Sequence, residues 1–190
     1  MKRLIAFILL LIFTGYSWAL QTIEIKDRHT DQNITPVLEF LPAPDDVRWP
    51  WEVASAPGWR HGDDEALTFG LESGSYWFRF TIDNRSGEQQ LLMLDVQHPL
   101  LDQLDVFFIK NGRIQRVWNT GLDRGIGAKP YPAKTFVLPL ALDIGERYDI
   151  YLRAQSDSFL QMPVVLQDIR LHANQQAVGK LQMGIMSGAF

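Results

Sequence analysis

Apolar and polar residues alternate in short segments along most of the chain, with turn-forming residues between the segments. This period of two residues places successive side chains on opposite faces of a strand. Many short strands with regularly spaced turns are typical of an all-β sandwich, which is the fold class we predict. The expected strands are residues 22–26, 35–41, 75–82, 90–96, 103–110, 113–120, 134–142, 147–155 and 162–171.

Three connections have distinct compositions. Residues 110–113 read KNGR, and the Asn-Gly pair predicts a type I′ hairpin because both central residues of that turn need positive φ. Residues 83–88, DNRSGE, predict a slightly longer hairpin loop. Residues 41–74 interleave four prolines with Trp49, Trp51 and Trp59, which indicates a long irregular segment. Such a segment either wraps the sandwich with its own side chains or takes part in function.

The N-terminus has the pattern of a secretory signal peptide. Lys2 and Arg3 precede an unbroken apolar run over residues 4–13, and small residues follow at Ser17 and Ala19. We therefore predict a signal peptide over residues 1–19 and export of the rest. The apolar run is shorter than the roughly 20 residues that span a bilayer. Residues 20–172 then form one periplasmic domain.

Composition narrows the choice of partner and chemistry. The chain has no cysteine, which the bacterial periplasm permits because disulfides are optional there. Without Lys2 and Arg3 the net charge is about −6, which argues against nucleic acid as a partner. Neither a G-x-S-x-G elbow nor a Gly-rich phosphate loop is present, and the four histidines are scattered. We therefore predict a chain that is not an enzyme.

Two expected strands carry the same unusual pair of outward residues. Trp77 and Arg79 share one face of strand 75–82, and Tyr151 and Arg153 share one face of strand 147–155. If the strands are neighbours, the four side chains form a patch of aromatic faces beside guanidinium groups. A sugar fits such a patch, because its C–H face stacks on an aromatic ring while hydroxyls or a carboxylate accept from arginine. An acidic peptide, or the segment 41–74 packing over the sheet, would fit it as well.

Two further clusters of polar residues either take part in binding or are ordinary solvent-exposed loops. Lys129, Tyr131 and Lys134 precede the strand 134–142 and either form the rim of the ligand site or face water in an ordinary connection. Residues 61–65, HGDDE, offer hard oxygen ligands for calcium, but their spacing fits no EF-hand loop. We expect a solvated acidic loop there, and we predict neither a bound metal nor a cofactor.

Several segments carry a family resemblance: GSYWFRFTIDN, HPLLDQLDVFFIKNGRI, YPAKTFVLPLAL and RYDIYLRAQSDSFLQMPVVL. The chain resembles, over about residues 22–171, the type 2 extracellular sensor domain of bacterial seven-transmembrane receptors with diverse intracellular signalling modules (7TMR-DISM). The most specific matches are residues 74–80 with Asn84, and residues 151–153 with Met162 and Pro163. In one departure, Lys129 and Lys134 stand where the family often has Arg or His, and lysine lacks the planar bidentate fork.

The resemblance implies a jelly-roll sandwich similar to carbohydrate-binding modules, displayed in the periplasm and anchored in the inner membrane by seven helices. Receptors of the family continue into cytoplasmic output modules such as histidine kinases or diguanylate cyclases. Residues 173–190 are similar to the linker and the start of the first membrane helix. The uncharged final ten residues, with Gly184 and Gly188, agree with that, although an ordinary C-terminal helix is the alternative.

The function expected from the sequence is that of a periplasmic ligand-sensing domain of a membrane receptor, with a saccharide-like ligand. One alternative is an interaction module that binds another receptor's sensor domain or a second copy of itself. The other is a secreted carbohydrate-binding accessory protein. The ligand site is expected at Trp77, Arg79, Tyr151 and Arg153, with Lys129, Tyr131 and Lys134 at its rim.

Overall fold

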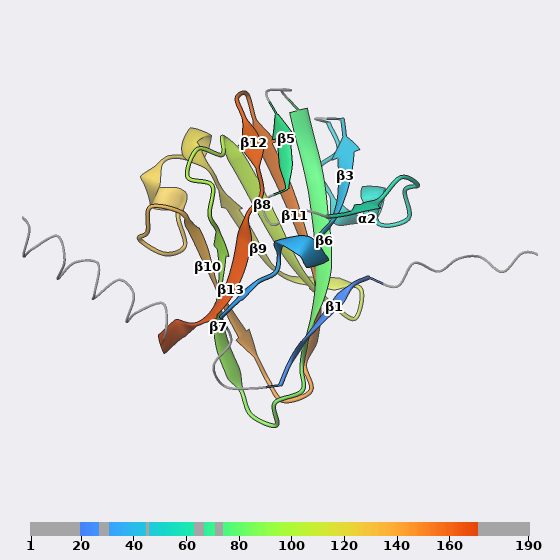
Figure 1. The fold of residues 1–190 in the computed structure, drawn as a ribbon, viewed down its shortest axis with the longest axis vertical. Coiled ribbons are helices and arrows are strands. Elements are labelled where there is room, and N and C mark those ends of the chain that lie inside the picture. Colours follow the sequence, from blue (N-terminus) through green and yellow to red (C-terminus); the bar gives the residue numbers. More distant parts are fainter. Residues whose placement is uncertain (1–19, 27–30, 45, 63–66, 71–73, 171–190) are drawn as a thin grey trace, which may run out of the picture.

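The computed structural model describes residues 20–26, 31–44, 46–62, 67–70 and 74–170, and within these residues the chain forms a sandwich of two main sheets (Figure 1). This confirms the predicted all-β fold class. The larger sheet has the order β4 (Arg60–His61), β3 (Glu39–Ala43), β6 (Gly74–Asn84), β11 (Arg147–Ser156), β8 (Gln103–Lys110) and β9 (Arg113–Thr120), and β1 (Thr22–Ile25) also pairs with β6. The smaller sheet has the order β10 (Phe136–Leu142), β7 (Gln90–Val96), β13 (Val164–Asp168) and β2 (Asp31–Asn33).

Short elements connect or flank these sheets. A two-stranded ribbon pairs β12 (Leu160–Gln161) with β5 (Thr68–Gly70). One short α-helix, α2 (Pro50–Val53), lies between β3 and β4 in the sequence. Three 3₁₀ turns occur in the described part of the chain: η1 (Thr35–Val37), η2 (Leu122–Arg124) and η3 (Ile126–Ala128).

The main core lies between the two sheets and follows the period of two. On β6, Phe78, Phe80 and Ile82 point inward and are fully buried. They meet inward residues of the smaller sheet, among them Leu92, Leu94, Val96, Phe136, Leu138, Val164 and Leu166. Burial of each such side chain stabilises the fold by about 1.5–3 kcal/mol. The alternation in the sequence is therefore the pattern of one buried face for each strand.

The strand predictions are largely confirmed, and two are corrected at prolines. The strands expected at 90–96, 103–110 and 113–120 have these bounds in the structure. Residues 35–37 instead form η1, which has Pro36 in its first turn, and the strand begins at Glu39. The strand expected at 162–171 begins after Pro163 and ends at Asp168. Proline has no N–H for a sheet ladder, so it interrupts a pattern that hydropathy alone would extend.

The two predicted hairpin turns have different outcomes. Asn111 and Gly112 both have positive φ, 51° and 70°, between the paired strands β8 and β9, as the type I′ prediction requires. Residues 83–88 are not a hairpin loop, because β6 and β7 belong to different sheets. The loop instead crosses from one sheet to the other. Asn84 fixes this crossing, since its Nδ2 donates to the backbone oxygens of Glu88, Leu142 and Asp143 at 2.7, 3.1 and 3.0 Å.

Both of the longer edge strands are protected from pairing with another chain. Pro139 lies in β10, at the edge of the smaller sheet. In β9 the ladder pairs Phe108 with Arg116 and Ile109 with Ile114, which leaves Gln115 as an extra residue in a bulge. Prolines and bulges at edges interfere with continuous pairing. This arrangement argues against a homodimer formed by strand pairing at β9 or β10.

Some sequence predictions concern residues outside the described ones. These are the signal peptide, residues 1–19, the acidic residues Asp63, Asp64 and Glu65, and the linker and membrane-helix start at 173–190. Within the described residues, none of the helices has the length and apolar character needed to cross a membrane.

Candidate ligand-binding site

The larger sheet brings together the four residues expected at the ligand site. β6 and β11 are antiparallel neighbours, and their register sets Trp77 opposite Arg153 and Arg79 opposite Tyr151. The expected patch therefore exists on the sheet face that points away from the main core. It is not open, however, because Trp77 and Arg153 have no exposed surface and Arg79 and Tyr151 are each only 6% exposed.

The segment that covers this face is residues 46–59, which we call the cover. Figure 1 shows it, with α2, on the side of the larger sheet away from β7, β10 and β13. α2 begins at Pro50, and the carboxylate of Glu52 accepts the N–H groups of Arg48 and Trp49 at 2.9 and 2.7 Å. Under the cover, a second small core forms, consisting of Leu41, Val53, Trp77, Phe107 and Tyr151. Of the two alternatives drawn from the sequence for the Pro- and Trp-rich segment, packing over the sandwich describes residues 46–59.

Two arginines of the sheet hold the cover by its backbone. Arg153 Nε donates to the oxygen of Val47 at 3.1 Å, and Arg79 Nη1 donates to the oxygen of Ala54 at 2.8 Å. Trp59 Nε1 closes the segment on itself by donating to the oxygen of Val53 at 2.9 Å. These part-buried bonds supply backbone partners that the cover lacks, because it has no regular ladder of its own. The outward arginines thus hold the cover against the sheet.

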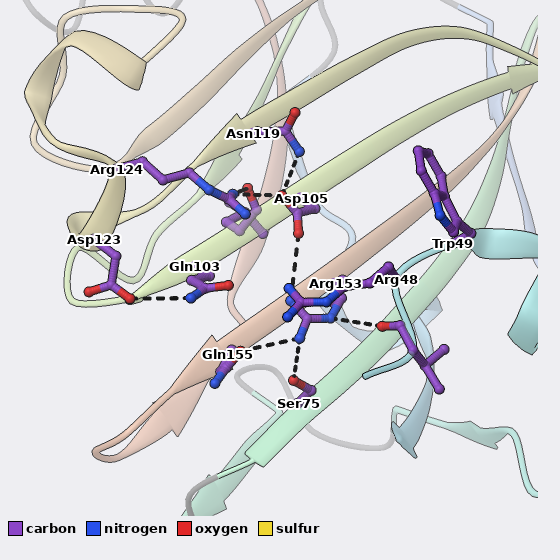
Figure 2. A network of polar contacts seen from close by, with 12 residues as sticks. Arg48, Trp49, Ser75, Gln103, Asp105, Asn119, Asp123, Arg124, Arg153 and Gln155 are labelled. Carbon is purple, nitrogen blue, oxygen red and sulfur yellow. Dashed lines mark hydrogen bonds and ion pairs between the residues drawn. The ribbon is translucent and has the colours of Figure 1, made fainter. Parts of the chain in front are cut away.

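Arg153 belongs to a buried network centred on Asp105 (Figure 2). Its Nη1 lies 3.6 Å from Asp105 Oδ2, and its Nη2 donates to Ser75 Oγ at 2.9 Å. Asp105 Oδ1 also accepts from Asn119 Nδ2 and pairs with Arg124 Nη1, each at 2.6 Å. One carboxylate therefore pairs with two guanidinium groups, of which Arg153 is fully buried and Arg124 is 27% exposed. A buried charge of this kind is tolerated only when it is paired.

Arg79 and Tyr151 border a cavity of about 610 Å³, the Arg79 cavity. Arg79 Nε donates to Glu39 Oε2 at 2.6 Å, and its guanidinium carbon lies 3.9 Å from the centre of the Trp59 ring. Burial raises the pKa of the Tyr151 phenol, although Arg79 opposes that shift, so the hydroxyl stays protonated at neutral pH. The lining residues are Leu20, Glu39, Ala54, Ser55, Ala56, Pro57, Gly58, Trp59, Arg79 and Tyr151.

A second cavity of about 540 Å³, the Trp51 cavity, also borders Ala54 and Tyr151. The Trp51 indole stacks on that of Trp49, with 4.9 Å between ring centres and 8° between planes, and it is 61% exposed. The lining residues are Pro50, Trp51, Ala54, Ile109, Gly112, Arg113, Ile114, Asp149 and Tyr151.

The three residues expected at the rim do not line either cavity. Lys129 Nζ donates to the backbone oxygens of Ala133 and Lys134 at 3.1 and 3.0 Å, and it lies 4.8 Å from the centre of the Phe136 ring. Phe136 begins β10, which belongs to the smaller sheet. Lys129 therefore stabilises its own connection. Lys134 is exposed and Tyr131 half-buried in the same connection.

Sequence reasoning missed residues at both cavities, among them Glu39 at the Arg79 cavity and Trp51 at the other. Glu39 lies on β3 opposite His61 on β4, and His61 Nδ1, which lines neither cavity, is 3.7 Å from Glu39 Oε1. The alternation of residues 35–41 places Glu39 among apolar neighbours, which is a usable sign of a buried partner for an arginine. The sequence indicates Trp51 as a cavity residue less clearly, because a tryptophan in a Pro-rich segment is as well suited to packing against the sheet as to binding a ligand. No group of potential metal ligands occurs among the described residues.

The described residues thus form a sandwich domain with two cavities on one covered sheet face. Residues 35–168, more than half of the chain, match the family model described as 7TMR-DISM extracellular 2, and the chain belongs to this family. The match confirms the resemblance drawn from the sequence. The family is a non-catalytic extracellular sensor domain of seven-transmembrane receptors. No curated protein matches the chain.

Proposed function

We propose that this domain senses a saccharide-like ligand in the periplasm by binding it in the Arg79 cavity. The observation that carries the proposal is the composition of that cavity, which sets the aromatic rings of Trp59 and Tyr151 beside the opposite charges of Arg79 and Glu39. The receptor, anchored in the bacterial inner membrane, then passes the signal through its helices to a cytoplasmic output module.

The chemistry of the cavity fits a polyhydroxylated ring. Aromatic rings pack against the C–H face of a sugar, while charged groups of fixed orientation bind its hydroxyls. Glu39, only 2% exposed, can accept from hydroxyls, and the neutral Tyr151 phenol can donate. The bonds from Arg79 to Glu39 and to Ala54 hold the guanidinium plane in place. An acidic sugar would gain a charge-assisted contact with this group.

The same arginine connects the ligand to the cover. Arg79 binds the backbone oxygen of Ala54, which lies one residue after α2. A ligand that draws on the Arg79 donors therefore alters the contact that holds the cover. Signalling requires that the ligand prefer one arrangement of the domain over another, because it shifts an equilibrium only by that difference in affinity. We propose the cover as the element with two arrangements.

A thermal-shift screen of periplasmic and cell-wall saccharides, including acidic sugars, tests this function. A ligand at a hundredfold above its dissociation constant adds about 2.7 kcal/mol, which raises the melting temperature by roughly 5–10 °C. The shift should be lost or greatly reduced in Arg79→Lys and in Tyr151→Phe, each compared with its own ligand-free melting temperature. Arg85→Lys is the matched control, because Arg85 is exposed and pairs only locally with Asp83. No shift with any saccharide, or an equal shift in Arg79→Lys, would contradict the proposal.

A further inference from the structure

The Trp51 cavity differs in chemistry from the Arg79 cavity. Its walls are mostly apolar and come from the cover and from the three strands β8, β9 and β11, with Pro50, Trp51 and Ala54 lining it together with Ile109 and Ile114. Tyr151 separates the second small core from both cavities, since it belongs to that core and lines each of them. The Trp51 cavity therefore offers a ligand an apolar surface. It lies at the end of the larger sheet where the β8–β9 hairpin turns.

Two opposite charges stand at this apolar surface. Arg113 begins β9, directly after the Asn-Gly turn, and its side chain is exposed. Asp149 lies on β11, where its Oδ1 accepts from Thr81 Oγ1 at 2.8 Å and lies 4.0 Å from Arg147 Nε. The bond to Thr81 orients the Asp149 carboxylate, and 36% of that side chain is exposed. One anchored anion and one long cation thus line the same cavity.

Trp51 supplies a flat and oriented wall. One face of its indole is taken by Trp49, and Trp49 in turn lies 6.1 Å from the Phe107 ring of the second small core. This chain of aromatic contacts sets the plane of Trp51 without burying it, because 61% of the residue is exposed. Aromatic rings prefer such offset or stacked partners, and the contact is worth about 0.5–1.5 kcal/mol beyond the area that it buries.

We propose that the Trp51 cavity is a second ligand site, which binds a free α-amino acid with an aromatic or large apolar side chain. The α-ammonium group binds Asp149, the α-carboxylate binds the Arg113 fork, and the side chain packs on Trp51 and Ile114. An amino acid fits better than a sugar, because the cavity has one group of each charge and, apart from Tyr151, walls without the several polar groups that hydroxyls need. This inference does not rest on the proposed saccharide site, since Arg79 and Glu39 do not line this cavity.

Isothermal titration of the purified chain with L-phenylalanine tests the inference. Phenethylamine, which lacks the carboxylate, and 3-phenylpropionate, which lacks the ammonium group, are the chemical controls. We expect saturable binding of L-phenylalanine, and binding at least about tenfold weaker for each of the two analogues. The variants Trp51→Ala, Arg113→Gln and Asp149→Asn should each weaken L-phenylalanine binding by about tenfold or more.

Arg116→Gln is the matched control variant, because Arg116 lies on the same strand but faces the Trp118 ring at 5.6 Å and does not line the cavity. It should leave binding unchanged. Absence of saturable heat up to the solubility limit of L-phenylalanine would overturn the inference. So would binding that is equally strong in Trp51→Ala and Arg113→Gln. Binding of hexoses that depends on Trp51, without binding of L-phenylalanine, would overturn the ligand class.

Discussion

Trp77 on β6 and Arg153 on β11 face each other across neighbouring strands, and neither side chain is exposed to solvent. The Trp77 ring stacks on Phe107 at 5.7 Å, while Arg153 reaches the carboxylate of Asp105 and the backbone of Val47. The pair joins a small apolar core to a polar network under the cover. A sheet face that the sequence offers as a binding surface is thus also a structural interface within the domain.

The first prediction concerns the packing of Trp77. Trp77→Ala should destabilise the domain by about 3–5 kcal/mol, because it leaves a cavity in the second small core. Trp77→Phe should cost much less, since the indole Nε1 has no hydrogen-bond partner among the described residues. Urea unfolding followed by circular dichroism measures both. The exposed Trp51 is the control, and Trp51→Ala should cost under about 1 kcal/mol. Similar losses for Trp77→Ala and Trp51→Ala would show that the cover is not packed as described.

The second prediction concerns the shared carboxylate. Asp105→Asn should destabilise the fold by about 3–5 kcal/mol, because Arg153 and Arg124 then lose the anion that balances them. Asp123→Asn is a matched control on the adjoining turn, since Asp123 is exposed and accepts only a 3.3 Å bond from Gln103. It should change stability by less than about 0.5 kcal/mol. Equal midpoints in urea for the two variants would contradict the structural role of the network.

The sequence predicts most strands and the outward pairs on residues 75–82 and 147–155, because both depend on local alternation. The face shared by Trp77 and Arg79 follows directly from the period of two, and β11 repeats it. Which sheet a strand joins is not a local property. Residues 83–88 favour a turn whether the chain forms a hairpin or crosses to the other sheet. Only the packing of β7 against β6 across the core determines that they cross between sheets.

The alternating pattern also does not predict which segment covers a sheet face. An outward arginine can face water, a ligand or a carbonyl group, and the sequence pattern is the same for all three. Here Arg79 binds the backbone oxygen of Ala54, 25 residues earlier in the sequence, and Arg153 binds that of Val47, 106 residues earlier. For a related reason Lys129, which the sequence offers as part of the rim, lies beside the smaller sheet, because it is near β10 in the sequence.

The third prediction tests the β8–β9 turn with two glycines. Gly112 and Gly127 both have open space where a Cβ would stand, but only Gly112 has a positive φ, 70°. Gly112→Ala should therefore cost about 1–2 kcal/mol from backbone strain, whereas Gly127→Ala should be neutral or slightly stabilising. Thermal unfolding of the two variants makes the comparison. A neutral Gly112→Ala would indicate that the turn adopts another conformation.

The last prediction concerns pH and the pair of Glu146 and Lys110, whose Oε1 and Nζ are 2.6 Å apart. Burial raises the pKa of Glu146, but hydrogen bonds from Lys110, the Asp143 N–H and Tyr148 outweigh it and bring that pKa below 4.5. The hydrogen bond to Glu146 raises the pKa of Lys110 above 10.5. A carboxyl group with a lowered pKa in the folded state stabilises the fold above its unfolded pKa, and this contribution is lost as the pH falls through the folded pKa. For the lysine the contribution is lost as the pH rises through its raised pKa.

Glu146→Gln should therefore lower the free energy of unfolding by a constant amount between about pH 6 and pH 9, and the difference from the parent chain should shrink below about pH 4.5. Urea unfolding of both chains across this range measures the difference. Glu24→Gln is the matched control, because Lys26 also lowers the pKa of Glu24 but the pair is exposed to water. Exposed pairs contribute little, so the control should follow the parent chain at every pH. A Glu146→Gln difference that stays constant down to pH 3 would show that the ionised carboxylate of Glu146 is not the group that stabilises the fold.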